Sequence, residues 1–362
     1  MGKINIDFMD AVIVGNDIWF FSMDYNGLFS VNMDTEEIVF RGQVPWEEEM
    51  KNGLYNSICA TNKKIYLIPF MATQMAVYDI ETSSFKAVKI GDAEKSQNYA
   101  EAILHDDKIF MFNYYNPYIG IVDINREEVC IIDSFQNKIK DIEIEDETIW
   151  FRKQPILIDD IIYMPCAKAN AIVQIDCKSK DCQVNILGKE KQGYAGACLV
   201  EEEIWLLPRK GKQHICVCDT KTMNGYRKQT LQQETDLYYV GIEKIGEQIW
   251  IFSNQTREKS AEENLVCVKN HKHLFVKRCG EYVITLDNEE GTLYLYQGKS
   301  GECIRHFPVC FDKKFVKQLL KKKTLSETTN FRIVDLLEEI NELAFEEKTV
   351  EQNIGKCIFE TI

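Results

Sequence analysis

The sequence predicts an all-β fold, a β-propeller, because one strand phrase recurs along most of the chain. An apolar strand that carries an aromatic residue appears six times, in the phrases DIWFFS, KIYLIPF, KIFMFN, IIYMP, EIWLLP and QIWIFS. These aromatic residues, here called the anchors, are Trp19, Tyr66, Phe110, Tyr163, Trp205 and Trp250. The intervals between them are 47, 44, 53, 42 and 45 residues. Self-similarity at this period is typical of propeller blades or of solenoid arrays.

The segment from Tyr55 to Ile90 shows what one repeat contains. YNSICAT is a short alternating strand, and Asn62-Lys63 forms the turn to KIYLIPF, which is apolar almost throughout. MAVYDI and FKAVKI supply a third and a fourth strand, with the turn DIETSS between them. Four antiparallel strands in about 36 residues is the size of a propeller blade.

An aspartate recurs at the end of the third strand of these repeats. The five examples are Asp34, Asp79, Asp123, Asp176 and Asp219. An aspartate in this position can accept hydrogen bonds from backbone amides two residues further on, and so fix a hairpin turn. We therefore interpret these residues as structural and not as catalytic.

The repeats resemble those of kelch-like and related bacterial propeller proteins, from residue 8 to about residue 308. Three features carry the resemblance: the isoleucine–aromatic anchor, the proline that follows it at Pro69, Pro165 and Pro208, and the aspartate turn. The resemblance implies a propeller architecture and no particular activity.

The number of blades depends on how the region after Trp250 is divided. HLFVKRCGEYVITL aligns with VGIEKIGEQIWIF, and TLYLYQ and ECIRHF follow it. The anchor of this repeat would be Tyr282, only 32 residues after Trp250, so the sixth blade should lack a clear outer strand or share residues with the seventh. We predict seven four-stranded blades, with six as the alternative. Residues 3–6, KINI, are a candidate for completing the last blade and closing the ring.

The chain changes character near its C-terminus. We assign residues 1–310 to the propeller and residues 311–362 to a helical C-terminal tail. Apolar residues between Ile333 and Ala344 fall on one helical face, and Thr329 or Asn330 can cap the helix. This tail is expected to pack on the propeller; docking to a partner, or self-association through these helices, is the alternative.

Charge and cysteine use limit the classes of partner and compartment. The net charge of −14 argues against nucleic acid, and no run of 18 apolar residues predicts a membrane span. The N-terminus lacks the apolar stretch of a signal peptide. Most of the 13 cysteines replace apolar residues within strand phrases, which is typical of reduced thiols. We predict a cytoplasmic protein without disulfides, with Cys177 and Cys182 as the pair most able to form one.

Motifs for catalysis or metal binding give little support to either. The sequence has no phosphate-binding loop, nucleophile elbow or HExxH motif. Cys267, His271, His273 and Cys279 are able to bind metal, but their spacing fits no zinc pattern. The prediction is that the protein has no metal site and no cofactor.

A second repeated position lies eleven residues before each anchor. It holds Phe8, Tyr55, Tyr99, Arg152, Tyr194 and Tyr239. Because innermost strands line the channel of a propeller, these residues could form a binding ring at one mouth, where tyrosines stack on a ligand. Alternatively, the tyrosines pack between neighbouring blades. Arg152 departs from the pattern and could bind an anionic group.

Two residues further along lie the positions that would share the same strand face. They hold Asp10, Ser57, Glu101, Gln154, Gly196 and Gly241. Glu101 is the candidate general base if the site is catalytic. Glu101 and Arg152 lie in adjacent repeats, so they could also form an ion pair without any role in binding.

The sequence therefore leaves two functions open. The first is a non-enzymatic cytoplasmic binding or scaffold protein that uses one propeller face, with a protein partner or a small anionic or sugar ligand. The second is an enzyme of the lactonase, epimerase or lyase type that acts on a sugar or small acid at the channel mouth.

Overall fold

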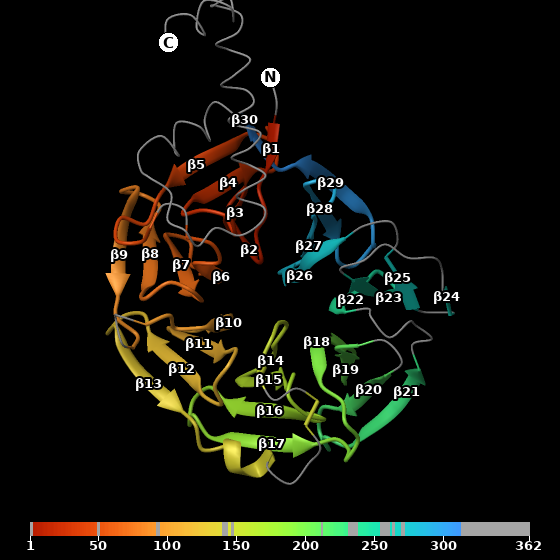
Figure 1. Ribbon diagram of the computed structural model, residues 1–362. Coiled ribbons are helices and arrows are strands. Elements are labelled where there is room, and N and C mark those ends of the chain that lie inside the picture. Colours follow the sequence, from red (N-terminus) through yellow and green to blue (C-terminus); the bar gives the residue numbers. More distant parts are fainter. Residues whose placement is uncertain are drawn as a thin grey trace, which may run out of the picture.

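Seven four-stranded β-sheets are arranged as a ring in the structure, a computed structural model (Figure 1). It describes residues 3–48, 51–91, 95–139, 144–145, 148–210, 213–230, 238–253, 261–262, 265–268 and 272–312. The prediction of seven four-stranded blades is confirmed, and the alternative of six is wrong. The helical tail expected over residues 311–362 lies outside the described residues, apart from 311 and 312, which belong to a strand.

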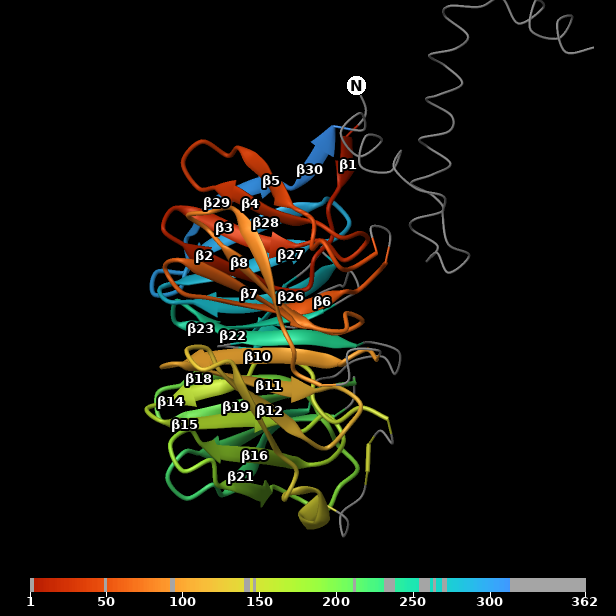
Figure 2. The ribbon, with the colours of Figure 1, turned by 90° about the vertical axis from the view of Figure 1, so that its left-hand side faces the viewer.

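Each blade is built from one continuous stretch of chain, with its first strand nearest the channel (Figures 1 and 2). Blades one to three contain β2 (Ala11–Val14), β3 (Asp17–Phe21), β4 (Leu28–Asn32), β5 (Ile38–Gly42); β6 (Tyr55–Ala60), β7 (Lys64–Pro69), β8 (Met75–Asp79), β9 (Ser84–Val88); and β10 (Tyr99–His105), β11 (Lys108–Asn113), β12 (Ile119–Asp123), β13 (Glu128–Ile132). A 3-10 helix, η1 (Gln136–Ile139), follows blade three.

The remaining blades follow in chain order around the ring. They contain β14 (Ile156–Ile158), β15 (Ile161–Pro165), β16 (Ala171–Asp176), β17 (Cys182–Ile186); β18 (Tyr194–Val200), β19 (Glu203–Pro208), β20 (His214–Asp219), β21 (Gly225–Thr230); β22 (Tyr239–Ile245), β23 (Gln248–Ser253), β24 (Ala261–Glu262), β25 (Leu265–Cys267); and β26 (His273–Cys279), β27 (Tyr282–Asp287), β28 (Thr292–Gln297), β29 (Cys303–Pro308).

Blade six has a different strand order from the other six blades. Its order is β22-β23-β25-β24, and β25 runs parallel to β23. After β23 the chain therefore passes to the outer edge, forms β24, and returns as β25 between them. The expectation that this blade lacks an outer strand is wrong, because residues 261–262 form it.

The ring closes without any exchange of strands between blades. The N-terminal strand β1 (Lys3–Asn5) pairs with β30 (Cys310–Asp312) as a separate two-stranded sheet, on the outside of the ring between blades one and seven (Figure 1). The expectation that residues 3–6 complete the last blade is therefore wrong: β26 to β29 already form four strands. The β1–β30 pair instead joins the two ends of the propeller across the closing interface.

Seven apolar clusters hold the ring together, one at each interface between neighbouring blades. The anchors occupy equivalent places in the second strands, as their spacing predicts, and each lies in the interface with the following blade. Five of the six are nearly fully buried, and Trp250 is half-buried. The blade-seven equivalent is Ile284 and not Tyr282, because Ile284 pairs with Lys277 as Trp250 pairs with Glu243. Because Ile284 is not aromatic, the search for an aromatic anchor selected Tyr282, two residues earlier.

A belt of backbone hydrogen bonds joins the blades on one face. The residue that precedes the innermost strand of a blade forms backbone hydrogen bonds with a loop of that blade and with a loop of the preceding blade. Asn98 donates its N–H to the carbonyl of Phe70 at 2.8 Å and accepts from Tyr114 at 2.7 Å. The same pattern continues as Trp150 donates to Tyr114 and Ala167 donates to Trp150. Loop backbone is thus satisfied across blade interfaces, as buried donors and acceptors require.

The recurrent aspartates fix turns, as predicted. Asp79, Asp123, Asp176 and Asp219 each accept hydrogen bonds from backbone amides two or three residues further on, or both, at 2.7 to 3.0 Å. These backbone hydrogen bonds lower the pKa of all four carboxyl groups. Blade one is the exception, because the acceptor there is Asn32 and not Asp34.

Two further predictions concern disulfides and membrane-spanning helices. The eleven cysteines that the structure describes in this respect are free, including Cys177 and Cys182. In the described part of the chain, no helix combines the length and the apolar character that a membrane crossing needs.

Replacing an anchor should destabilise the protein in proportion to its burial. Trp205 is 5% exposed within the cluster between blades five and six, so Trp205→Ala should lower the free energy of unfolding by about 3–5 kcal/mol. Trp250→Ala, at the half-buried equivalent position, is the matched control and should cost less. Urea unfolding of the variants measures both values. Equal losses would contradict the assignment of Trp205 as an interior anchor.

Candidate functional site

The aromatic residues predicted at the channel mouth are buried between blades. The rings of Phe8, Tyr55, Tyr99, Tyr194 and Tyr239 are at most 3% exposed. Each belongs to the cluster that its own blade shares with the preceding blade, or, for Phe8, with blade seven. The hydroxyl of Tyr194, for example, donates to Asn170 of blade four. The structure thus matches the packing alternative at these five positions, and it does not show an aromatic lining of the channel.

Arg152 does not occupy the position in blade four that corresponds to these five aromatic residues. Tyr99 pairs with Asn113, three residues after its anchor, and the corresponding residue in blade four, Cys166, pairs with Phe151. Phe151 is fully buried between blades three and four, while Arg152 is half-buried. Phe151 lies twelve residues before the anchor Tyr163, whereas in the other blades the corresponding distance is eleven residues. A fixed count of eleven therefore selects Arg152 in place of Phe151. In blade seven the corresponding residue is His273, which is buried against Phe252.

Polar side chains from five blades meet in the channel instead. Asp10 lies beside Lys277 of blade seven, with Nζ 2.8 Å from Oδ1 and 2.9 Å from Oδ2. The hydroxyl of Ser57 is 2.7 Å from Asp10 and 2.6 Å from Glu101. Glu101 is in turn 3.5 Å from the amine of Lys153 in the segment leading to β14. We call these five residues the channel cluster.

The channel cluster also satisfies backbone amides of the innermost strands. Asp10 accepts from the N–H of Ala11 and of Ile58, at 2.8 and 3.0 Å. Glu101 accepts from the N–H of Ala102 at 3.0 Å. Lys277 donates to the carbonyl of Ile58 at 3.1 Å. These donors and acceptors lie on the channel side of the strands, where no further strand can pair with them.

Burial and charge pairing together set the ionisation of this cluster. Burial would raise the pKa of Asp10, but Lys277 and Lys153 hold that pKa below its ordinary value. Burial would lower the pKa of Lys277, but the carboxylates of Asp10 and Glu101 raise it above its usual range. Both members of the Asp10–Lys277 pair therefore stay charged at neutral pH. Stability from Asp10 is lost only as the pH falls below about 4 and through its folded pKa.

Gln154 makes a second connection across the channel. Its side-chain amide donates to the carbonyl of Ile242 at 2.8 Å and accepts from the N–H of Ile242 at 3.0 Å. The side chain passes Gly196 of blade five and reaches blade six. A Cβ at Gly196 would be 2.2 Å from Oε1 of Gln154, and a Cβ at Gly241 would be 2.7 Å from it. The two glycines at these positions therefore leave the space that the Gln154 side chain occupies.

A third polar pair lies between blades six and seven. Arg278 donates from Nε and Nη2 to Oε1 of Glu243, at 3.0 and 2.8 Å. Glu243 also accepts from the N–H of Lys244 at 3.0 Å. Burial raises the pKa of Glu243 in spite of Arg278, so this carboxyl group is the more easily protonated of the two buried acids that pair with Lys277 and Arg278.

Two cavities lie beside these polar residues, where the innermost strands end. A cavity of about 320 Å³ is bounded by β10, the segment 154–157, β18, β22 and β26, and one of about 580 Å³ by β2, β6, β10, β26 and the turn after it. Both are lined by Ala102, Ile103, Lys277 and Arg278. We call this region, where the innermost strands end, the end mouth.

Aliphatic walls and a charged floor characterise the end mouth. Ile13, Ile103, Leu104, Leu157 and Leu199 line one or both cavities, and all five are half-buried or exposed. Below them, Glu101, Lys277 and Arg278 supply charge. Pockets for small ligands have volumes in this range and combine apolar walls with few polar groups. Of the channel-facing residues considered in the sequence, Glu101 and Gln154 line the smaller cavity.

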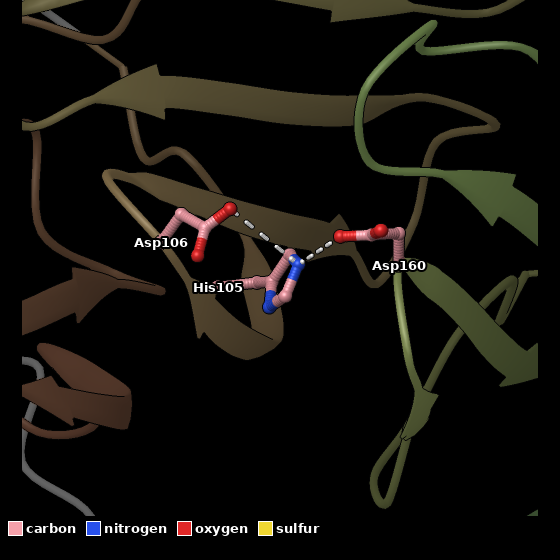
Figure 3. A group of neighbouring side chains, drawn as sticks. All are labelled: His105, Asp106 and Asp160. Atoms are coloured by element: carbon pink, nitrogen blue, oxygen red, sulfur yellow. Dashed lines mark hydrogen bonds and ion pairs between the residues drawn. The ribbon is translucent and has the colours of Figure 1, made fainter.

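A different group of side chains on the surface has the composition of a metal site. His105 Nε2 lies 2.9 Å from Asp160 Oδ1 and 3.7 Å from Asp106 Oδ2, in turns of blades three and four (Figure 3). Asp160 is already paired with Lys178 on its other oxygen. The contacts are those of a surface ion-pair network between two blades, and they do not change the prediction that the protein lacks a metal site.

Comparisons with known proteins support the fold alone. No family model and no curated protein matches the chain. Among solved structures, the chain is similar to the computationally designed Ika8 protein, with a TM-score of 0.54, 10% identity and coverage of 85% of this chain and 89% of that one. It is similar to the β-propeller domain of Cps50 (Swd1) from Myceliophteria thermophila, with a TM-score of 0.54, 10% identity and coverage of 82% and 99%. It is also similar to PorZ, a surface component of the type-IX secretion system of Porphyromonas gingivalis, with a TM-score of 0.55, 12% identity and coverage of 85% of this chain and 39% of that one. The chain is a seven-bladed β-propeller.

Breaking the Asp10–Lys277 pair should cost more than removing both charges. Lys277→Met leaves a buried carboxylate without its closest cation and should lower the free energy of unfolding by about 3–5 kcal/mol. The double variant Asp10→Asn/Lys277→Met keeps the shapes, removes both charges and should lose less. Urea unfolding at pH 7 compares the two. A double variant as unstable as the single one would show that the pair is not the main interaction of Lys277.

Proposed function

We propose that the protein is a non-enzymatic binding protein of the cytoplasm that takes its ligand at the end mouth of the channel. The observation that carries this proposal is the convergence of two cavities on Ala102, Ile103, Lys277 and Arg278. Strand ends from several blades bound this space, and the polar contacts of the channel cluster connect those blades beside it. A preformed pocket of this kind favours binding because little ordering is needed when the ligand enters.

The contacts of Glu101 favour binding over catalysis. Its Oε1 accepts from the N–H of Ala102 and lies beside Ser57, and its Oε2 lies beside Lys153. These contacts engage both carboxylate oxygens of Glu101 within the protein, so neither oxygen is left unpaired to act as a general base on a ligand. The enzymatic alternative, with Glu101 as general base, therefore has less support than a binding role.

The free cysteines are consistent with the proposed compartment, since reduced, buried thiols are usual in the cytoplasm. The resemblance to kelch-like repeats is part of the same proposal, but it concerns the repeat architecture alone, because a fold by itself does not specify a function. The proposal covers both a free small molecule and a side chain of a protein partner, since both would use the same cavity.

Filling the end mouth should abolish binding. Ile103 lines both cavities and is half-buried at the edge of the apolar cluster between blades three and four, so Ile103→Trp places an indole at the mouth. Ile131→Trp adds the same bulk at a 50%-exposed position on the outer strand of the same blade and is the matched control. The measurement is ligand-observed NMR with a mixture of sugars, amino acids and short carboxylic acids.

Probes that bind the native protein should lose their signal with Ile103→Trp, keep it with Ile131→Trp, and be recovered chemically unchanged. Binding that survives Ile103→Trp would place the site elsewhere. Conversion of a probe, abolished by Glu101→Gln, would support the enzymatic alternative instead.

A further inference from the structure

The charges that the end mouth presents to a ligand are mainly positive. The side chains of Lys277 and Arg278 are 23% and 38% exposed. Their partners Asp10 and Glu243 are only 4% and 8% exposed, and Glu101 is 7% exposed. Glu101 and Glu243 also line the smaller cavity but are far less exposed than the cations, and the larger cavity is lined by Lys277 and Arg278 and by none of these three acids. This arrangement contrasts with the net charge of −14 of the whole chain.

Arg278 keeps hydrogen-bonding capacity for a ligand. Its Nε and Nη2 are engaged by Glu243 and by the carbonyl of Lys244. Among the described residues, Nη1 has no acceptor, and it stands close over Gly298. A guanidinium with one engaged edge still offers planar donors to a carboxylate.

The walls around these cations are aliphatic. Ile13, Ile103, Leu104, Leu157 and Leu199 surround the mouth, and burial of each methylene of a ligand against such walls contributes about 0.8 kcal/mol. The larger cavity, about 580 Å³, has room for a chain of several carbons together with its head group. One acid lies at the rim: Glu281 is exposed and accepts from Gln297 at 3.0 Å.

We propose that the ligand of the end mouth is an amphipathic carboxylate, an aliphatic chain with an anionic head. The chain lies against the leucine and isoleucine walls. The carboxylate lies at the floor, against Lys277 and Arg278. This inference rests on the proposed function, because it names the ligand class of the same site.

The test uses three probes of equal chain length: octanoate, 1-octanol and octylamine. Isothermal titration calorimetry at pH 7.5 gives the affinity of each for the native full chain. We expect octanoate to bind at least about tenfold more tightly than 1-octanol, the difference that one charge-assisted hydrogen bond provides. Octylamine should bind more weakly than 1-octanol, because its charge meets the two cations.

The variant Asp10→Asn/Lys277→Met removes the cation without leaving its partner unpaired, and the ratio of octanoate to octanol affinity should fall toward one. The matched control is Lys221→Met/Glu202→Gln, which removes an exposed ion pair of 2.7 Å outside the channel and should leave the ratio unchanged. If the channel variant does not fold, Arg278→Gln provides the same comparison.

Equal binding of octanoate and octanol, tighter binding of octylamine, or no binding of any probe would overturn the inference. Ile103→Trp separates this failure from failure of the proposed function. If it abolishes a charge-independent binding of octanol, the end mouth is a binding site and only the ligand class is wrong. If octanol binds Ile103→Trp as it binds the native protein, the proposed function is wrong as well.

Discussion

The innermost strand of each blade has a strand neighbour on one side only, and its backbone groups on the channel side must find other partners. In this protein side chains supply them. Asp10, Glu101, Gln154 and Glu243 accept from the amides of Ile58, Ala102, Ile242 and Lys244. Because these acceptors are buried acids and an amide, the channel also needs cations, and Lys153, Lys277 and Arg278 provide them. The polar content of the channel follows from the open strand edges.

This arrangement separates the two halves of the channel. Where the innermost strands begin, side chains reach from blade to blade and fill the space between them. Where the strands end, small and aliphatic residues face the axis, and the cavities remain. Apolar clusters at the seven interfaces supply most of the stability, as burial of apolar surface generally does. The polar contacts determine which part of the channel stays hollow, and therefore where a ligand can enter.

The sequence predicted the architecture because the features that specify a blade are local. The anchor phrases, the aspartate turns and the repeat length all lie within one stretch of about 40 residues. The errors arise where a local count fails. One extra residue in blade four replaces Arg152 by Phe151 in the aromatic ring. An isoleucine at position 284 hid the seventh anchor, and the returning path of β24 and β25 has no repeat to predict it.

The channel cluster could be predicted only in part. Asp10, Ser57, Glu101 and Gln154 share one offset from their anchors, and four polar residues at an innermost position are an unusual set that did indicate a polar channel. Lys277 and Lys153 lie at other offsets from their anchors and reach the cluster through long side chains. Asp10 and Lys277 are 267 residues apart in the sequence. Repeat spacing contains no information about such contacts, so the pairing of Glu101 with Lys153 in place of Arg152 needed the structure.

Hydrogen exchange at the channel-facing amides tests this account most directly. In the native protein the amides of Ile58, Ala102 and Ile242 should exchange as slowly as amides paired between β10 and β11, because buried side chains accept their hydrogens. Site-resolved exchange followed by NMR gives these rates. Slow exchange at all three sites is the expected result. Exchange as fast as that of exposed turn amides would show that side chains do not satisfy the inner strand edges, and would contradict the account.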